Sequence, residues 1–369
     1  PPATYNPLDV VDRNDPNAVA VAQSLAEAIC PPPRGNESPF WQGRAAKVLA
    51  AVFLWLADEP GEQKTLARAR DIVSRSRKDF RDNFLVRMAV SGAFNGAIRE
   101  MVSPLIDLAD ETYSGVLSNL NEQMKFISDI QTKAATATSS FRMEDLLDGK
   151  TTIYLVIPPG RMSTQRTWLR LVLTAAIQTV KKARTRHQEG RCMFLIDEFA
   201  ALGRIDEIPT EIATVRGYGI DMTLVIQGLE QLKASYGDSH VAILDNCSYK
   251  WFCNVADLKT AKYLSDSLGQ KTISTKKKSF TKGESASDNR QSENQGETTS
   301  FDEMGRLLLT PAEVMTLGRD YAVVLQTTDR PLFLRTVDYW SLTDAFQHLA
   351  ETHPAFFWQP PLGYDPNPY

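Results

Sequence analysis

The sequence predicts an α/β protein with a parallel sheet, preceded by a separate all-helical block. Between residue 41 and about residue 145, apolar residues recur every three or four positions, which is typical of helices packed on a core. After residue 150, short apolar runs rich in β-branched residues alternate with helical segments, which favours a parallel sheet. One of these runs ends on two adjacent acids, Asp197 and Glu198, at the place where parallel sheets bind ligands.

Composition narrows the class of protein. The chain has 369 residues, 43% of them hydrophobic, which is enough for about two domains. A net charge of −4 argues against a strongly basic nucleic-acid binder, although a local basic patch is compatible with it. The four cysteines form no CxxC pair, so we expect reduced, buried thiols, and the four histidines show no metal-binding spacing. The longest apolar run, residues 48–57, is shorter than the ~20 residues of a membrane-spanning helix, so the chain is expected to be soluble.

Two segments define the helical block. Their apolar residues share a helical spacing that predicts a buried face on each. In the first segment these residues are Trp41, Ala45, Val48, Leu49, Val52 and Leu56, and in the second they are Val116, Leu117, Leu120, Met124, Ile127 and Ile130. We predict an all-α domain over residues 41–148.

The predicted strands follow this block. Each is a short apolar run, and helical segments such as 163–188 separate the first ones. Two late runs are expected to close the sheet as an antiparallel pair. The predicted strands cover 151–160, 192–197, 222–227, 248–255, 320–328 and 331–340.

Residues 274–305 consist almost entirely of Ser, Thr, Lys, Glu, Gln, Asn and Gly. Such a composition cannot bury a core, so we predict a flexible loop. Its basic start, with Lys276, Lys277 and Lys278, is a weak candidate for contact with a nucleic-acid backbone. A solvated loop without that contact is the favoured alternative.

The acidic pair suggests phosphate chemistry. In nucleoside triphosphatases with a phosphate-binding loop, the acid that closes this strand holds Mg²⁺ near the β- and γ-phosphates. A neighbouring glutamate can orient and polarise the attacking water. We assign the first role to Asp197 and the second, as catalytic base, to Glu198. The structural alternative is that Asp197 only caps the next helix.

Two downstream residues strengthen this interpretation. Gln227 closes the neighbouring predicted strand, where a polar side chain could sense the γ-phosphate or position water. Arg216 ends a helix before a turn made by Gly217 and Gly219, at the opposite edge of the sheet. There it could reach a neighbouring subunit's nucleotide as an arginine finger. The alternatives are that Gln227 satisfies loop backbone and that Arg216 complements a helix dipole.

The chain resembles the TraG/TraD-type coupling-protein ATPases of type IV secretion and bacterial conjugation. The resemblance lies in "YNPLD" (5–9), "TIYLVIPPG" (152–160), "FLIDEFAALGR" (194–204) and the stretches 216–237, 243–273 and 306–340, in the family's order. It implies a RecA-like P-loop NTPase core with an inserted all-α domain, ATP and Mg²⁺ as ligands, and a hexameric ring. On this basis residues 1–40 are a remnant of the N-terminal part of the RecA-like domain, 149–345 its main part, and 346–369 a C-terminal tail.

The phosphate loop that the family implies, GxxxxGK[ST], does not occur in the chain. The partial match "LGQKTIST" (268–275) lacks both the leading glycine and the strand–loop–helix context, so we reject it. We therefore expect the chain alone to hydrolyse ATP negligibly. Truncation of a longer protein and a short paralogue unable to bind ATP both stay open as explanations.

The resemblance implies a protein that uses ATP to deliver a relaxase–DNA complex, or protein substrates, to the inner-membrane components of a secretion channel. The complete protein is then expected at the cytoplasmic face of the bacterial inner membrane. One alternative is a non-catalytic substrate receptor or ring subunit. Another is a DNA-pumping translocase of the cell-division type, which the helical insertion disfavours.

Overall fold

The computed structural model describes residues 2–31, 40–185, 190–205, 208–209, 212–287 and 290–337. The chain divides into two compact units, Pro1–Asn246 and Cys247–Tyr369. The boundary predicted after residue 148 lies inside the first unit, and the proposed domain division stays a prediction. The predicted tail, 346–369, lies outside the described residues.

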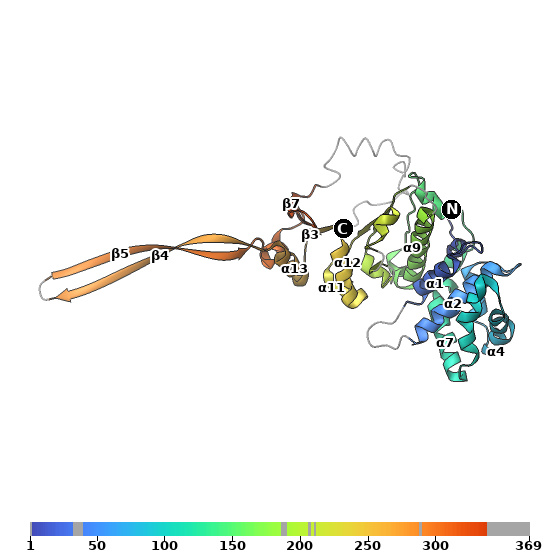
Figure 1. Ribbon diagram of the computed structural model, residues 1–369. Coiled ribbons are helices and arrows are strands. Elements are labelled where there is room, and N and C mark those ends of the chain that lie inside the picture. The colour runs from blue at the N-terminus through green and yellow to red at the C-terminus, as the bar shows by residue number, and fades with distance from the viewer. Residues whose placement is uncertain are drawn as a thin grey trace, which may run out of the picture. The chain divides into compact units, whose positions relative to one another are not determined.

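The first unit is mostly helical, and a single hydrophobic core runs through it from Tyr5 to Ile243. Within that core α1 and α9 pack side by side (Figure 1). Short 3₁₀ or π turns are marked η. The elements are η1 (Pro7–Val10), α1 (Ala18–Ile29), α2 (Phe40–Asp58), α3 (Leu66–Val73), α4 (Arg77–Phe80), η2 (Arg81–Leu85), α5 (Val86–Ala89), η3 (Ala93–Gly96), α6 (Ala97–Ile106), α7 (Asp110–Gln123), η4 (Met124–Ser128), α8 (Ile130–Ala135), η5 (Met143–Leu147), η6 (Pro159–Arg161), α9 (Met162–Thr185), β1 (Cys192–Ile196), η7 (Phe199–Leu202), η8 (Val215–Tyr218), β2 (Ile220–Leu224), α11 (Leu229–Tyr236), η9 (Gly237–Ser239) and α12 (His240–Asn246).

Residues 40–148 contain helices and no strand, as predicted. The predicted faces are buried in α2 and α7, for example at Val48, Leu49 and Leu120. Ile130 is the exception, since its side chain is 83% exposed. Asp129 caps a new helix, α8, which begins at Ile130. The three-to-four-residue spacing of the preceding helix therefore does not continue to Ile130. The side chain of Trp41 lies outside the described part.

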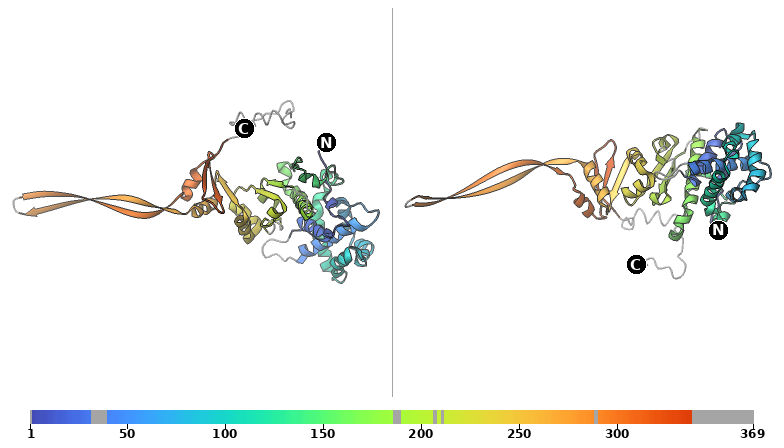
Figure 2. Two further views of the ribbon diagram at one scale, coloured as in Figure 1. Left: turned by 45° about the horizontal axis from the view of Figure 1, so that its top comes forward. Right: turned by 90° about the horizontal axis from the view of Figure 1, so that it is seen from below.

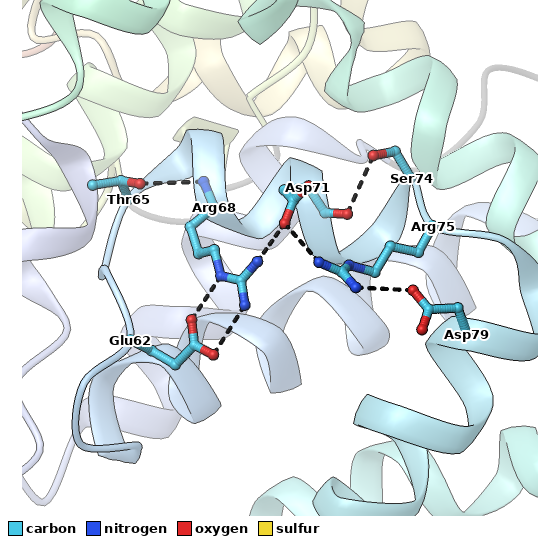
Figure 3. A network of polar contacts seen from close by, with 7 residues as sticks. All are labelled: Glu62, Thr65, Arg68, Asp71, Ser74, Arg75 and Asp79. Carbon is cyan, nitrogen blue, oxygen red and sulfur yellow. Dashed lines mark hydrogen bonds and ion pairs between the residues drawn. The ribbon is translucent and has the colours of Figure 1, made fainter.

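A charged network links α3, α4 and the loop before α3 (Figure 3). Arg68 donates two hydrogen bonds to the carboxylate of Glu62, at 2.6 and 3.0 Å, and a further one to Asp71. Arg75 bridges Asp71 and Asp79, at 3.3 and 2.9 Å. The network therefore ties the loop at Glu62 to two successive helices.

We expect Glu62→Gln to lower the melting temperature at pH 7, with the difference from the native chain shrinking below about pH 5. The hydrogen bonds from Arg68 lower the pKa of Glu62. A carboxyl whose pKa is lower in the folded state stabilises the fold above its unfolded pKa of about 4.3, and this stabilisation is lost as the pH falls through the folded pKa. Thermal melts between pH 7 and pH 3 test this. Glu122→Gln, in an exposed pair with Lys125, is the control and should change little; a Glu62→Gln deficit that stays constant with pH would contradict the assignment.

The sheet of the first unit is the parallel pair β1–β2. Its register runs from Cys192 opposite Ile220 to Ile196 opposite Leu224. The strand predicted over 192–197 is confirmed for Cys192–Ile196, whereas β2 starts two residues before the predicted 222–227 and ends at Leu224. Cys192, Phe194 and Ile196 are buried, but Met193 and Leu195 are 65% and 66% exposed. We expected other elements to cover both faces of the sheet. In the described part of this unit only one face of β1 is covered.

The strand predicted over 151–160 was wrong. Residues 151–158 carry no regular secondary structure, and η6 begins at Pro159. Tyr154 and Val156 are 82% and 81% exposed. An apolar β-branched run forms a strand only where a neighbouring strand pairs with its backbone, and none of the described strands does so here.

The second unit has an antiparallel sheet in the order β3–β6–β7. The predicted antiparallel closing pair is confirmed as β6–β7. Of the run 248–255, residues Tyr249–Cys253 form a strand, β3. This strand pairs antiparallel with β6, so the prediction that it belongs to a parallel sheet was wrong for its described pairing. Residues 338–340 of the last predicted strand lie outside the described part. The elements are β3 (Tyr249–Cys253), α13 (Leu258–Leu268), β4 (Gln270–Ser287), β5 (Arg290–Leu307), α14 (Pro311–Thr316), β6 (Tyr321–Gln326) and β7 (Leu332–Arg335).

The segment predicted as a loop, 274–305, forms most of a two-stranded ribbon. β4 and β5 pair antiparallel from Gln270 opposite Leu307 to Ser287 opposite Arg290. Figure 2 shows the ribbon as long and twisted, with no other described element of its unit along its outer part. The prediction of an irregular loop was therefore wrong. Polar residues can still form paired strands when two neighbouring segments of the chain lie antiparallel, because the backbone makes the hydrogen bonds. Its mobility stays a prediction, since an isolated two-stranded hairpin is marginally stable.

Two other expectations concern single residues and membrane spans. All four cysteines are free thiols. The predicted burial is confirmed for Cys30 and Cys192, but it was wrong for Cys247, which is half-buried, and for Cys253, which is exposed. Burial raises the pKa of the Cys30 thiol to about 12.

Among the described helices, none has the length and apolar content that crossing a membrane requires.

Candidate active site

The acidic pair forms a tight turn at the carboxyl end of β1. Two backbone hydrogen bonds to Val225 bracket the turn: Val225 N donates to Ile196 O, and Phe199 N donates to Val225 O, both at 2.9 Å. Asp197 and Glu198 are therefore held between two fixed points just beyond the parallel strands. This is the edge of the sheet at which the sequence predicted them.

Glu198 adopts a left-handed backbone conformation, with φ 52° and ψ 45°. A residue with a Cβ atom is disfavoured there by roughly 1–2 kcal/mol, so glycine would fit the turn better. Such strained positions are concentrated at functional sites. A glutamate therefore stands where its backbone conformation is disfavoured, and this points to a function of its side chain.

The Gln227 side chain contacts the Glu198 carboxylate. Its Nε2 donates to Glu198 Oε1 at 2.7 Å, although the residues are 29 positions apart. Gln227 lies three residues beyond the end of β2 rather than in the strand, because β2 ends at Leu224. The structure therefore brings together the two side chains that sequence reasoning assigned to the attacking water and the γ-phosphate.

Asp197 is exposed at the same edge, and its Oδ1 accepts a hydrogen bond from the backbone N–H of Glu198 at 3.2 Å. No group of three or more potential metal ligands occurs within the described residues. Nucleotide-bound Mg²⁺ needs only one or two carboxylates, because phosphates and waters complete its octahedron. An exposed carboxylate at a strand end fits that requirement.

Arg216 lies apart from these residues. It belongs to η8, which precedes β2, so it stands at the amino end of the strand whose carboxyl end leads to Gln227. Its side chain is exposed. The sequence expectation of a position at the opposite edge of the sheet is confirmed, and its role across a subunit interface stays a prediction.

The three lysines of the weak nucleic-acid site lie on β4 of the second unit. Lys277 pairs with Asp302 at 2.7 Å across the ribbon, and Lys276 and Lys278 alternate with it along the strand. Alternating side chains point to opposite faces of a strand, so the three charges do not share a face. The partial phosphate-loop match at 268–275 joins the end of α13 to β4, which is a helix-to-strand connection, and its rejection is supported.

Sequence reasoning missed Gln231. Its side chain, in the first turn of α11, makes two hydrogen bonds to Gln227. The available signal was a glutamine three residues after Gly228, where side chains at a helix start reach back to preceding backbone N–H groups.

Two parallel strands with acids at their carboxyl edge, preceded by a helical block, define an α/β protein whose candidate site lies at that edge. The chain belongs to the family described as type IV secretory system conjugative DNA transfer, whose model matches residues 2–357. It is 26% identical over 340 residues to the conjugal transfer protein TraG of Rhizobium radiobacter, covering 89% of this chain and 51% of that protein. It is 31% identical over 211 residues to the protein VirD4 of Rhizobium radiobacter, covering 57% of this chain and 29% of VirD4. The chain thus spans about half the length of the TraG relative.

The fold resembles solved structures of the bacterial conjugative coupling protein TrwB. An unbound form lacking 70 N-terminal residues superposes with a TM-score of 0.65 at 15% identity, covering 90% of this chain and 71% of that one. The TrwB complex with ADP and Mg²⁺ gives 0.63 at 14% identity, with 90% and 70% covered. The predicted fold, an α/β core interrupted by helices, is confirmed by this likeness. The family match also disfavours the cell-division translocase.

Proposed function

We propose that the gene product is a coupling ATPase that moves DNA, as a relaxase–DNA complex, or protein substrates into a type IV secretion channel. The observation that carries this is the contact of Glu198 with Gln227 beside Asp197, at the carboxyl edge of the parallel strands, in a chain of the conjugative DNA transfer family. We further propose that it acts as a hexamer at the cytoplasmic face of the inner membrane and contacts the channel's inner-membrane components.

Each of the three residues at the carboxyl edge has one task in this proposal. Asp197 holds Mg²⁺, which when bound neutralises charge on the β- and γ-phosphates. Glu198 accepts a proton from the water that attacks the γ-phosphorus, and Gln227 orients that carboxylate through its amide. The solved TrwB complexes with ADP and Mg²⁺ and with an ATP analogue support nucleotide and Mg²⁺ as the ligands.

We expect Glu198→Gln to lower the frequency of conjugative DNA transfer by about a hundredfold or more, in cells that express the variant in place of the native gene. The glutamine keeps the size of the side chain but cannot accept the proton. Asp238→Asn, an exposed acid of η9 outside the site, serves as the control and should transfer normally.

Immunoblots must show equal amounts of both variants. A Glu198→Gln strain that transfers DNA at the native frequency would overturn the hydrolytic role. It would instead favour the alternative of a non-catalytic receptor or ring subunit.

A further inference from the structure

Three side chains form a continuous polar chain at the site. Gln231 Nε2 donates to Gln227 Oε1 at 3.1 Å, and Gln227 Nε2 donates to Glu198 Oε1 at 2.7 Å. The backbone N–H of Gln227 donates in turn to Gln231 Oε1 at 3.3 Å. Gln231 therefore contacts Gln227 twice, once at its backbone and once at its amide.

Each amide in this chain has only one orientation that satisfies its partners. An ionised Glu198 only accepts hydrogen bonds, so Gln227 must present its Nε2 to it and its Oε1 to Gln231. The backbone N–H of Gln227 only donates, so Gln231 must present its Oε1 there and its Nε2 to Gln227. The two requirements agree, and the amide of Gln227 is thereby oriented from both sides.

The helix that carries Gln231 is fixed to the turn that carries Glu198. On its buried face, Tyr236 stacks on Phe199 with ring centroids 5.4 Å apart, and its hydroxyl accepts from Ile205 N at 3.2 Å. Ser235 Oγ donates to Ala200 O at 3.3 Å. With that face anchored to η7, the exposed face holds Gln231 at a constant position relative to Glu198.

We propose that Gln231 is a positioning residue for ATP hydrolysis, which orients Gln227 so that its amide donor remains on Glu198. This rests on the proposed function of Glu198. Without Gln231 the amide of Gln227 can rotate, and the carboxylate loses the donor that fixes its direction towards the attacking water. The expected consequence is slower chemistry with unchanged nucleotide binding.

A capping role alone is the competing explanation. Gln231 is the third residue of α11, where a glutamine side chain commonly accepts a backbone N–H near the helix start. Gln231→Glu separates the two roles. The carboxylate still accepts from Gln227 N and suits a helix start, but it has no donor for Gln227 Oε1. It would draw the Nε2 of Gln227 away from Glu198.

The test measures kcat, KM for ATP and melting temperature in the native gene product, purified in its assembled form. Gln231→Glu should lower kcat about tenfold and leave KM and the melting temperature unchanged. Lys233→Gln makes the same change of charge on an exposed position of α11 and should behave as the native protein. The double variant Gln227→Ala/Gln231→Ala should have the kcat of Gln227→Ala alone, because Gln231 acts only through Gln227.

A native kcat for Gln231→Glu, or losses that multiply in the double variant, overturns the proposal. Glu198→Gln measured in parallel separates this failure from that of the proposed function. If Glu198→Gln is inactive and Gln231→Glu is fully active, only the positioning role fails. If Glu198→Gln hydrolyses ATP normally, the hydrolytic role and the positioning role fail together.

Discussion

Arg216→Ala is expected to remove nearly all ATP hydrolysis by the assembled gene product, a fall of about 10³–10⁵-fold, with almost no change in melting temperature. Arg216 is exposed at the amino edge of the parallel pair, whereas Asp197 and Glu198 lie at the carboxyl edge. Five strand residues at about 3.3 Å each separate the two edges by roughly 16 Å. An arginine so placed acts on a neighbouring subunit's nucleotide, or it only complements the local helix dipole.

The two roles differ in magnitude and in the chemistry they require. A cation at a helix end contributes about 0.3–1 kcal/mol to stability, and lysine supplies it as well as arginine does. A finger that makes two charge-assisted hydrogen bonds to γ-phosphate oxygens needs the planar guanidinium. Arg216→Lys is thus the matched control. It should have the native melting temperature but regain hydrolysis only in small part.

Mixed rings test the placement across the interface. Arg216→Ala and Glu198→Gln subunits are each inactive alone, but co-assembly creates interfaces with an intact Glu198 on one side and an intact Arg216 on the other. Some hydrolysis should therefore return. Nearly native activity of Arg216→Ala, or no recovery in rings shown to contain both subunits, would rule out the finger and leave the dipole interpretation.

Gly219→Ala is expected to have the largest effect on stability, a loss of about 2–5 kcal/mol. Gly219 has φ +74°, which costs a residue with a Cβ about 1–2 kcal/mol. A Cβ there would lie 2.6 Å from Gly190 O, on the segment that leads into β1. The Gly219 carbonyl also accepts from Cys192 N at 3.0 Å, so relief of the clash would disturb the start of the parallel pair.

Gly217→Ala is the control two residues away. A Cβ at Gly217 would meet no atom within 4 Å, and its φ lies outside the left-handed region. That variant should unfold within about 1 kcal/mol of the native chain. Thermal and urea unfolding of the purified chain compare the two. Equal stability of the two variants would show that the turn does not require glycine at Gly219.

Much of this molecule follows from local sequence. The helical block follows from apolar spacing, because a helix must bury one face wherever it packs. The acid pair could be placed at a strand end because "CMFLID" passes directly from apolar to charged residues. The opposite position of Arg216 follows from its place before the strand that ends near Gln227, since parallel strands share their direction.

Other features depend on contacts between distant residues. The run 151–158 has the composition of a strand but pairs with none of the described strands. In the polar ribbon 270–307 the two strands pair with each other, although their composition does not predict strands. Backbone pairing decides both, and composition does not encode which segment lies alongside.

The sequence by itself determined which residues gather at the carboxyl edge of the parallel pair: Asp197, Glu198 and Gln227. Only the tertiary structure decided how they are held. The left-handed turn at Glu198 is bracketed by Val225, and the orientation of Gln227 depends on Gln231. The physical reason is that a hydrogen bond fixes direction as well as proximity, and its direction is set by donors and acceptors on another element of the fold.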